Sequence, residues 1–144
     1  MKSAPIERIL DEVIAGLFIL LFVYTGYNKL QEHQSFEKVM ARFPVVGSMS
    51  TFFAYALPIV ELLTAVLLIA PSKRKIGFYF SLALMICFTC YIASMLLFSE
   101  KLPCSCGGVL KGLTWLQHFI FNLCFTVLAV AGIYVNKRRK MLLQ

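Results

Sequence analysis

Two cysteines one residue apart, Cys104 and Cys106, have the residue type and spacing best suited to redox chemistry in this sequence. Pro103 precedes them, two glycines follow, and the segment separates two long apolar runs. Proline and glycine favour a turn, and a turn brings two Cα atoms within the roughly 4.4–6.8 Å that a disulfide requires. A bridge that closes so small a ring is strained and therefore exchangeable. The spacing predicts a thiol pair that opens and closes.

Two other interpretations of this pair stay open. A static bridge would stabilise the fold only slightly, because the effect of a disulfide grows with the length of the loop it closes. A metal site would add His118 to the two thiols. Zinc sites usually separate their cysteines by about two to four residues, whereas copper(I) accepts two thiolates. Lys101 and Lys111 lie near the pair and favour the thiolate that attacks disulfides. We therefore assign no metal ligands and favour exchange.

A second group of polar residues lies within the apolar runs. Trp115, His118 and Asn122 fall at i, i+3 and i+7, on one face of a helix. Glu61 lies roughly 15 Å from the membrane surface, where a carboxylate must be protonated or paired. Lys29, at the end of the first run, can reach inward to join Glu61, His118 and Asn122 in an internal polar cluster. This cluster either joins helices or, with Trp115, forms a site that tunes the thiols or binds a redox partner such as a quinone.

The composition is that of a membrane protein. Of the 144 residues, 60% are apolar and 15% are charged, and the mean hydropathy is +0.80, whereas soluble domains are about half apolar and a quarter charged. The net charge of +7 comes from short hydrophilic segments between apolar runs, which indicates membrane flanks and no nucleic-acid partner. We predict one all-α domain over residues 1–144, embedded in the lipid bilayer as a four-helix bundle with spans at about residues 9–30, 51–70, 76–98 and 115–135.

The hydrophilic connection between the first two spans predicts a short amphipathic helix at the membrane interface. Its apolar residues recur at helical spacing: Phe36, Val39, Met40 and Phe43. We expect Ser35 to be its N-cap, and Pro44 and Gly47 to end it. Further along the chain, Thr114 is expected to cap the fourth span.

Other polar or reactive residues have simpler expected roles. We expect the first span to be a retained helix and not a signal peptide, because acidic residues dilute its basic start and no cleavage site follows. Asp11, Glu12 and Lys29 flank this span and are expected at the lipid headgroups, unless Lys29 turns inward. The remaining cysteines are expected to be buried and to act as small apolar residues: Cys87, Cys90 and Cys124.

The distribution of basic residues predicts the orientation in the membrane. Nine of the 14 lysines and arginines fall on the side that holds both termini: Lys2, Arg8, Lys73, Arg74, Lys75, Lys137, Arg138, Arg139 and Lys140. Since basic residues are retained on the cytoplasmic side, both termini are predicted to be cytoplasmic. The cysteine segment then lies on the opposite, oxidising side.

Three motifs carry a family resemblance. Residues 24–30 (YTGYNKL) resemble the aromatic-x-Gly-x-x-Lys-Leu pattern of DoxX-like membrane proteins, and residues 57–62 (LPIVEL) resemble their Pro-x-x-Glu-Leu segment. The Cys-Ser-Cys-Gly-Gly segment at 104–108, followed by Trp115, His118 and Asn122, is similar to the MauE branch, named for methylamine utilisation.

The resemblance implies a bacterial inner-membrane protein with its cysteine segment in the periplasm. It implies a role in disulfide formation or maturation of exported proteins, with a thioredoxin-like partner or client protein. A similar layout in quinone-linked disulfide oxidases suggests quinone as an electron acceptor. The chain lacks the second exposed cysteine pair of those oxidases, so a partner is expected to supply it. The alternative is a non-catalytic subunit or assembly factor of a larger membrane complex, in which the cysteine loop is structural; copper or zinc handling is a third possibility.

Overall fold

The computed structural model describes residues 3–42, 46–98 and 114–142, and all regular structure in these ranges is helical. The elements are α1 (Ser3–Gln31), α2 (His33–Ala41), the 3-10 helix η1 (Gly47–Met49), α3 (Ser50–Ile69), α4 (Arg74–Phe98) and α5 (Trp115–Leu142). Four of them, α1, α3, α4 and α5, are long and apolar enough to cross a membrane. The predicted all-α, four-span architecture is confirmed.

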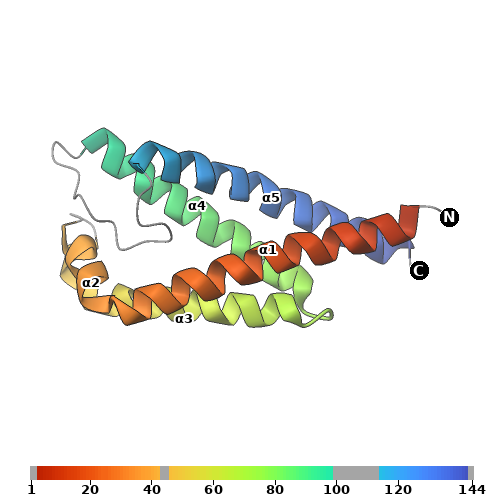
Figure 1. The fold of residues 1–144 in the computed structure, drawn as a ribbon, viewed down its shortest axis with the longest axis horizontal. Helices are drawn as coiled ribbons and strands as arrows, with labels where there is room; N and C mark the ends of the chain where they lie inside the picture. Colours follow the sequence, from red (N-terminus) through yellow and green to blue (C-terminus); the bar gives the residue numbers. More distant parts are fainter. Residues whose placement is uncertain (1–2, 43–45, 99–113, 143–144) are drawn as a thin grey trace.

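Each long helix runs antiparallel to the next one along the chain (Figure 1). The closest pairs are α1 with α3 and α4 with α5, while α1 also packs on α5 and α3 on α4. The first and last helices begin and end at one end of the bundle, called here the terminal end. At the opposite end, called here the α2 end, α2 packs mainly on α3.

The short helix predicted after the first span is present as α2, with Phe36, Val39 and Met40 buried. The prediction that Ser35 caps it is wrong. The helix begins at His33, and the Ser35 N–H donates to the Glu32 carbonyl, because helical hydrogen bonds continue almost without a break from α1. It ends at Ala41, so Gly47 does not end it but opens η1. Phe43 and Pro44 lie outside the described residues.

The start of α5 follows the prediction. The Gln117 N–H donates to Thr114 Oγ1 at 3.3 Å, and Gln117 Oε1 accepts from the Thr114 N–H at 2.9 Å. This reciprocal capping box satisfies two amide groups that the first turn of a helix leaves without partners. It fixes where α5 begins and therefore which face its first turns present to the bundle.

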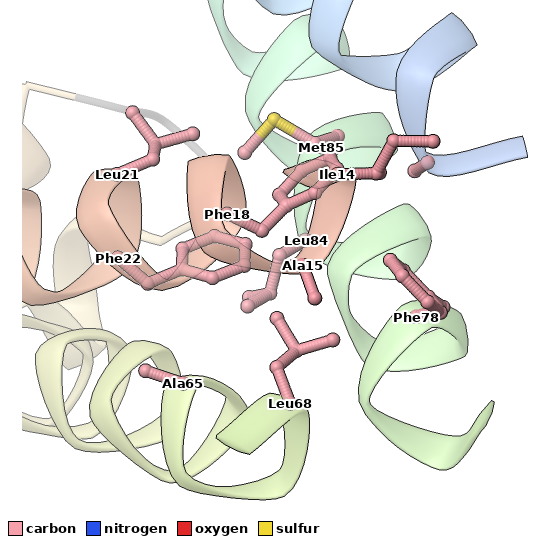
Figure 2. Packing of buried hydrophobic residues seen from close by; sticks show 11 residues of the cluster. Ile14, Ala15, Phe18, Leu21, Phe22, Ala65, Leu68, Phe78, Leu84 and Met85 are labelled. Atoms are coloured by element: carbon pink, nitrogen blue, oxygen red, sulfur yellow. The ribbon is translucent and has the colours of Figure 1, made fainter. Parts of the chain in front are cut away.

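The core lies between α1, α3 and α4 and is built on large side chains that are fully buried (Figure 2): Phe18, Phe22, Leu68 and Phe78. The Phe125 ring of α5 meets the Phe18 ring edge-to-face, with centroids 5.3 Å apart. Gly132 allows α5 to approach this core, because a Cβ atom there would lie 2.6 Å from Cε1 of Phe78. The packing of small against large residues holds α5 close to α1 and α4.

Candidate functional site: a polar-floored cavity within the helical bundle

A cavity of about 290 Å³ lies among the helices toward the α2 end of the bundle. Its walls are mostly apolar and aromatic, and all five α-helices, α1 to α5, contribute residues to them. The five described residues that the sequence singled out all line it: Lys29, Glu61, Trp115, His118 and Asn122. The structure therefore gathers into one space residues that are far apart along the chain.

A buried ion pair forms the polar floor of the cavity. Lys29 Nζ lies 2.5 Å from Glu61 Oε1, and the two side chains are 9% and 0% exposed. The same ammonium lies over the Phe88 ring, 4.3 Å from its centroid, and 5.4 Å from the centroid of the Phe36 ring. Of the two expectations for Lys29, the inward one is confirmed, because Glu61 and these rings offer the cation partners inside the protein. The expectation of a paired Glu61 is confirmed.

The two family-like motifs explain how this pair is aligned. A Cβ atom at Gly26 would lie 3.2 Å from Leu62 and 3.3 Å from the carbonyl oxygen of Pro58, so α1 and α3 approach each other closely at this level. Lys29 follows Gly26 by three residues and Glu61 follows Pro58 by three residues. Residues three apart share a helix face, so the close approach sets the two charged side chains opposite one another.

The second carboxylate oxygen of Glu61 has an unusual environment. Oε2 is buried and has no hydrogen-bond partner among the described residues. The Thr25 hydroxyl donates to the Phe22 carbonyl of its own helix at 3.4 Å and also lies near enough to Glu61 to interact with its carboxylate. A buried carboxylate oxygen without a donor costs free energy, so the floor of the cavity keeps an unused acceptor.

His118 and Asn122 bring polar groups to the cavity from α5. Their residues are 8% and 9% exposed. Asn122 Nδ2 donates to the His118 carbonyl at 3.0 Å, which satisfies the amide within its own helix. Within the described part of the chain, the imidazole of His118 has no hydrogen-bond partner. Trp115, half-buried one turn earlier, adds an aromatic surface beside it.

A second buried polar cluster lies at the terminal end and was missed from the sequence. Asp11 is fully buried. Its Oδ2 atom accepts hydrogen bonds from Arg74 Nη1 and from Arg139 Nη1, each at 2.8 Å. Its Oδ1 atom accepts a hydrogen bond from Asn136 Nδ2 at 2.9 Å. Arg74 Nε also donates to the Leu68 carbonyl at 3.0 Å. This Asp11 cluster ties α1, α3, α4 and α5 together. The expectation that Asp11 lies at the headgroups is therefore wrong, whereas Glu12 beside it is exposed and pairs with Arg8.

The cysteines divide into two sets. Cys104 and Cys106 lie outside the described residues. Cys87, Cys90 and Cys124 are free and exposed on the bundle, so the prediction that they are buried in the protein is wrong. The reason is that α4 and α5 pack through their other faces, which leaves these thiols on the outer surface of the bundle; Cys87 also lines the cavity.

The described residues contain no separate metal site. Within residues 3–42, 46–98 and 114–142, no group of three or more histidine, cysteine, aspartate or glutamate side chains could hold a metal ion.

The fold and the cavity define a class: a multi-pass membrane protein whose helices line a polar-floored cavity. The chain belongs to the MauE family, because the family model described as methylamine utilisation protein MauE matches residues 7–135. This agrees with the resemblance carried by the motifs. Among the curated proteins and the solved structures, none matches this chain.

Proposed function

We propose that this protein carries out thiol–disulfide exchange through Cys104 and Cys106, in support of disulfide formation or maturation of exported proteins. Its partner is a periplasmic thioredoxin-like protein or a client protein. The membrane is the bacterial inner membrane, with both termini in the cytoplasm and the cysteine segment on the periplasmic side. Membership of the MauE family and the Cys-x-Cys spacing support this proposal.

One observation about chain connectivity carries the proposal. The segment with the two cysteines connects the last residue of α4, Phe98, to the cap of α5, Thr114. The ends of both helices lie at the α2 end of the bundle, and the first turns of α5 line the cavity (Figure 1). The two described residues that flank the cysteine segment, Phe98 and Thr114, therefore lie at the same end of the bundle as the Lys29–Glu61 floor.

The exchange step follows from ordinary thiol chemistry. A thiolate of the reduced partner attacks the Cys104–Cys106 disulfide, and a mixed disulfide forms while one cysteine leaves as a thiolate. The second thiolate of the partner then attacks the mixed disulfide. The partner gains a disulfide, this protein becomes a dithiol, and two electrons and two protons have been transferred.

Single cysteine substitutions test this proposal. We expect both Cys104→Ser and Cys106→Ser to abolish exchange. Because each exchange step is reversible, the remaining thiolate can attack the disulfide of an oxidised partner, and one of the two variants should then accumulate the mixed disulfide, since it lacks the second cysteine that would release the partner. Membranes treated with acid and an alkylating agent, then separated without reductant, show the trapped species. Cys124→Ser is the matched control, because this thiol is exposed on a spanning helix outside the cysteine segment. Full activity in both variants, or a pair locked in one state, would instead indicate a structural loop in a subunit of a larger complex.

A further inference from the structure

The cavity combines a ring-sized apolar space with a buried cation and an unused acceptor. We infer that it binds the headgroup of a lipid-soluble quinone, which reoxidises the dithiol. The inference rests on the proposed function for its electron donor, but the binding itself involves only described residues of the bundle.

The size and walls of the cavity suit a single substituted ring. Its volume of about 290 Å³ is near the lower end of the roughly 300–1,000 Å³ typical of small-molecule sites. Aromatic side chains from two helices, Phe88, Trp115 and Phe121, line it and can stack on a flat ring. The cavity lies among helices that are long and apolar enough to span a membrane, and they enclose it only in part, so a ligand that is dissolved in the bilayer has a way in.

The polar groups complement both redox forms of a quinone. A quinone carbonyl accepts hydrogen bonds, and Lys29 Nζ, which has three N–H groups, uses one on Glu61 Oε1. A quinol hydroxyl donates, and Glu61 Oε2 is a buried acceptor without a partner among the described residues. The imidazole of His118 supplies a second polar contact. A lipid acyl chain has neither acceptor nor donor, so it would leave the floor of the cavity unsatisfied.

The electron balance agrees with the proposed exchange. Oxidation of the Cys104–Cys106 dithiol to the disulfide releases two electrons and two protons. Reduction of one quinone to one quinol consumes two electrons and two protons. The S–S bond forms, both S–H bonds break, and two O–H bonds form on the quinone, so no further oxidant is needed.

Trp115 is the only tryptophan of the chain and lines the cavity, so its fluorescence reports on this site. The experiment titrates decylubiquinone into the purified full-length protein in nanodiscs and follows Trp115 emission. We expect saturable quenching. The double variant Lys29→Met/Glu61→Gln removes both charges together and leaves no unpaired buried charge. We expect it to raise the apparent Kd by about tenfold or more, because hydrogen bonds that involve a charged group are lost.

Two further variants keep the test decisive. His118→Leu removes a polar contact without touching the ion pair, and we expect it to weaken binding severalfold even if the double variant does not fold. Leu123→Ala is the matched control, because Leu123 is exposed on α5 and does not line the cavity; it should bind like the parent protein.

The outcomes separate this inference from the proposed function. The quinone site is overturned if the quenching is linear, or if it is saturable but no variant alters it. If oleic acid displaces the signal equally in every variant, the cavity is a pocket for lipid chains instead. A Cys104→Ser/Cys106→Ser protein has no exchange activity but should still bind decylubiquinone. If exchange occurs and decylubiquinone does not bind, the quinone site is wrong and the exchange proposal stands.

Discussion

The charged residues of this protein lie where their partners are, and not where their hydropathy alone would put them. Asp11 is in an apolar helix, yet it accepts hydrogen bonds from Arg74, Asn136 and Arg139. Lys29 turns away from the headgroups toward Glu61. In a lipid environment a polar group without a partner is costly, so each charge is retained inside the bundle only with its counterpart.

Asp11→Asn tests the structural role of the Asp11 cluster. The substitution leaves two arginines, whose side chains are 10% and 15% exposed, without their carboxylate. We expect it to lower the free energy of unfolding by about 3–5 kcal/mol. Thermal unfolding in detergent measures the effect.

Glu12→Gln is the control for this experiment. Glu12 is adjacent in sequence, but its pair with Arg8 is on the surface, with side chains 51% and 73% exposed. We expect a change of at most about 1 kcal/mol. Equal stability of the two variants would mean that the cluster does not hold the bundle together.

The helices are held in register by close contacts at small residues. Gly26 brings α1 and α3 together one turn before Lys29, and Gly132 admits the Phe78 ring between α4 and α5. Interfaces between membrane helices depend on such contacts, because the lipid removes most of the hydrophobic drive for helix association. The cavity is the region toward the α2 end where this close packing gives way.

Gly132→Ala tests the packing of α5. Its new Cβ atom would lie 2.6 Å from the buried Phe78 ring and 3.1 Å from Ile14. We expect destabilisation by about 1–3 kcal/mol from overpacking. Gly16→Ala, at a helical position with nothing within 4 Å of the new Cβ, is expected to be neutral or stabilising by up to about 1 kcal/mol. Thermal unfolding of both variants in the same detergent gives the comparison, and a Gly132→Ala protein as stable as its Gly16→Ala counterpart would show that α5 has room to shift.

The sequence predicted the number and order of the spanning helices, because long apolar runs leave the backbone no other way to satisfy its hydrogen bonds. It was less reliable at the helix ends. α1 begins at Ser3 and α5 continues to Leu142, beyond the apolar runs. In the α5 extension Asn136 and Arg139 bind Asp11, and Arg138 pairs with Glu7 of the α1 extension. Ser35 was mistaken for a cap because the hydrogen bonds that lead from α1 into α2 cannot be read from residue types.

The grouping of polar residues around the cavity was predictable in part, whereas the Asp11 cluster was not. Trp115, His118 and Asn122 share a face by helical spacing, and the depth of Glu61 required a partner. The partners of Asp11 are 63, 125 and 128 residues away along the chain. Arg74 and Arg139 resembled ordinary basic flanks, and only the three-dimensional arrangement of four helices shows that they turn inward. A charged residue inside an apolar run, such as Asp11, is the signal that could have prompted a search for them.

Two different polar clusters lie at opposite ends of the bundle. The Asp11 cluster at the terminal end closes the helices together, while the Lys29–Glu61 pair near the α2 end lies in the wall of an open space. One end is therefore suited to hold the fold, and the other to admit a ligand. In the proposed orientation the first end faces the cytoplasm, and the second faces the periplasm with the cysteine segment.

Labelling of Cys104 and Cys106 in right-side-out membrane vesicles tests two things together: on which side of the membrane the thiols lie, and whether they cycle between dithiol and disulfide. The protein carries Cys87→Ser, Cys90→Ser and Cys124→Ser, so that a membrane-impermeant maleimide can react only with Cys104 and Cys106. We predict little labelling at first and labelling of both residues after an impermeant reductant. In a parallel sample, the reductant is washed out and decylubiquinone is supplied as oxidant before the maleimide is added, and we again predict little labelling. Equal labelling with and without reductant, or labelling only after the vesicles are lysed, would show that the pair does not cycle at the outer face.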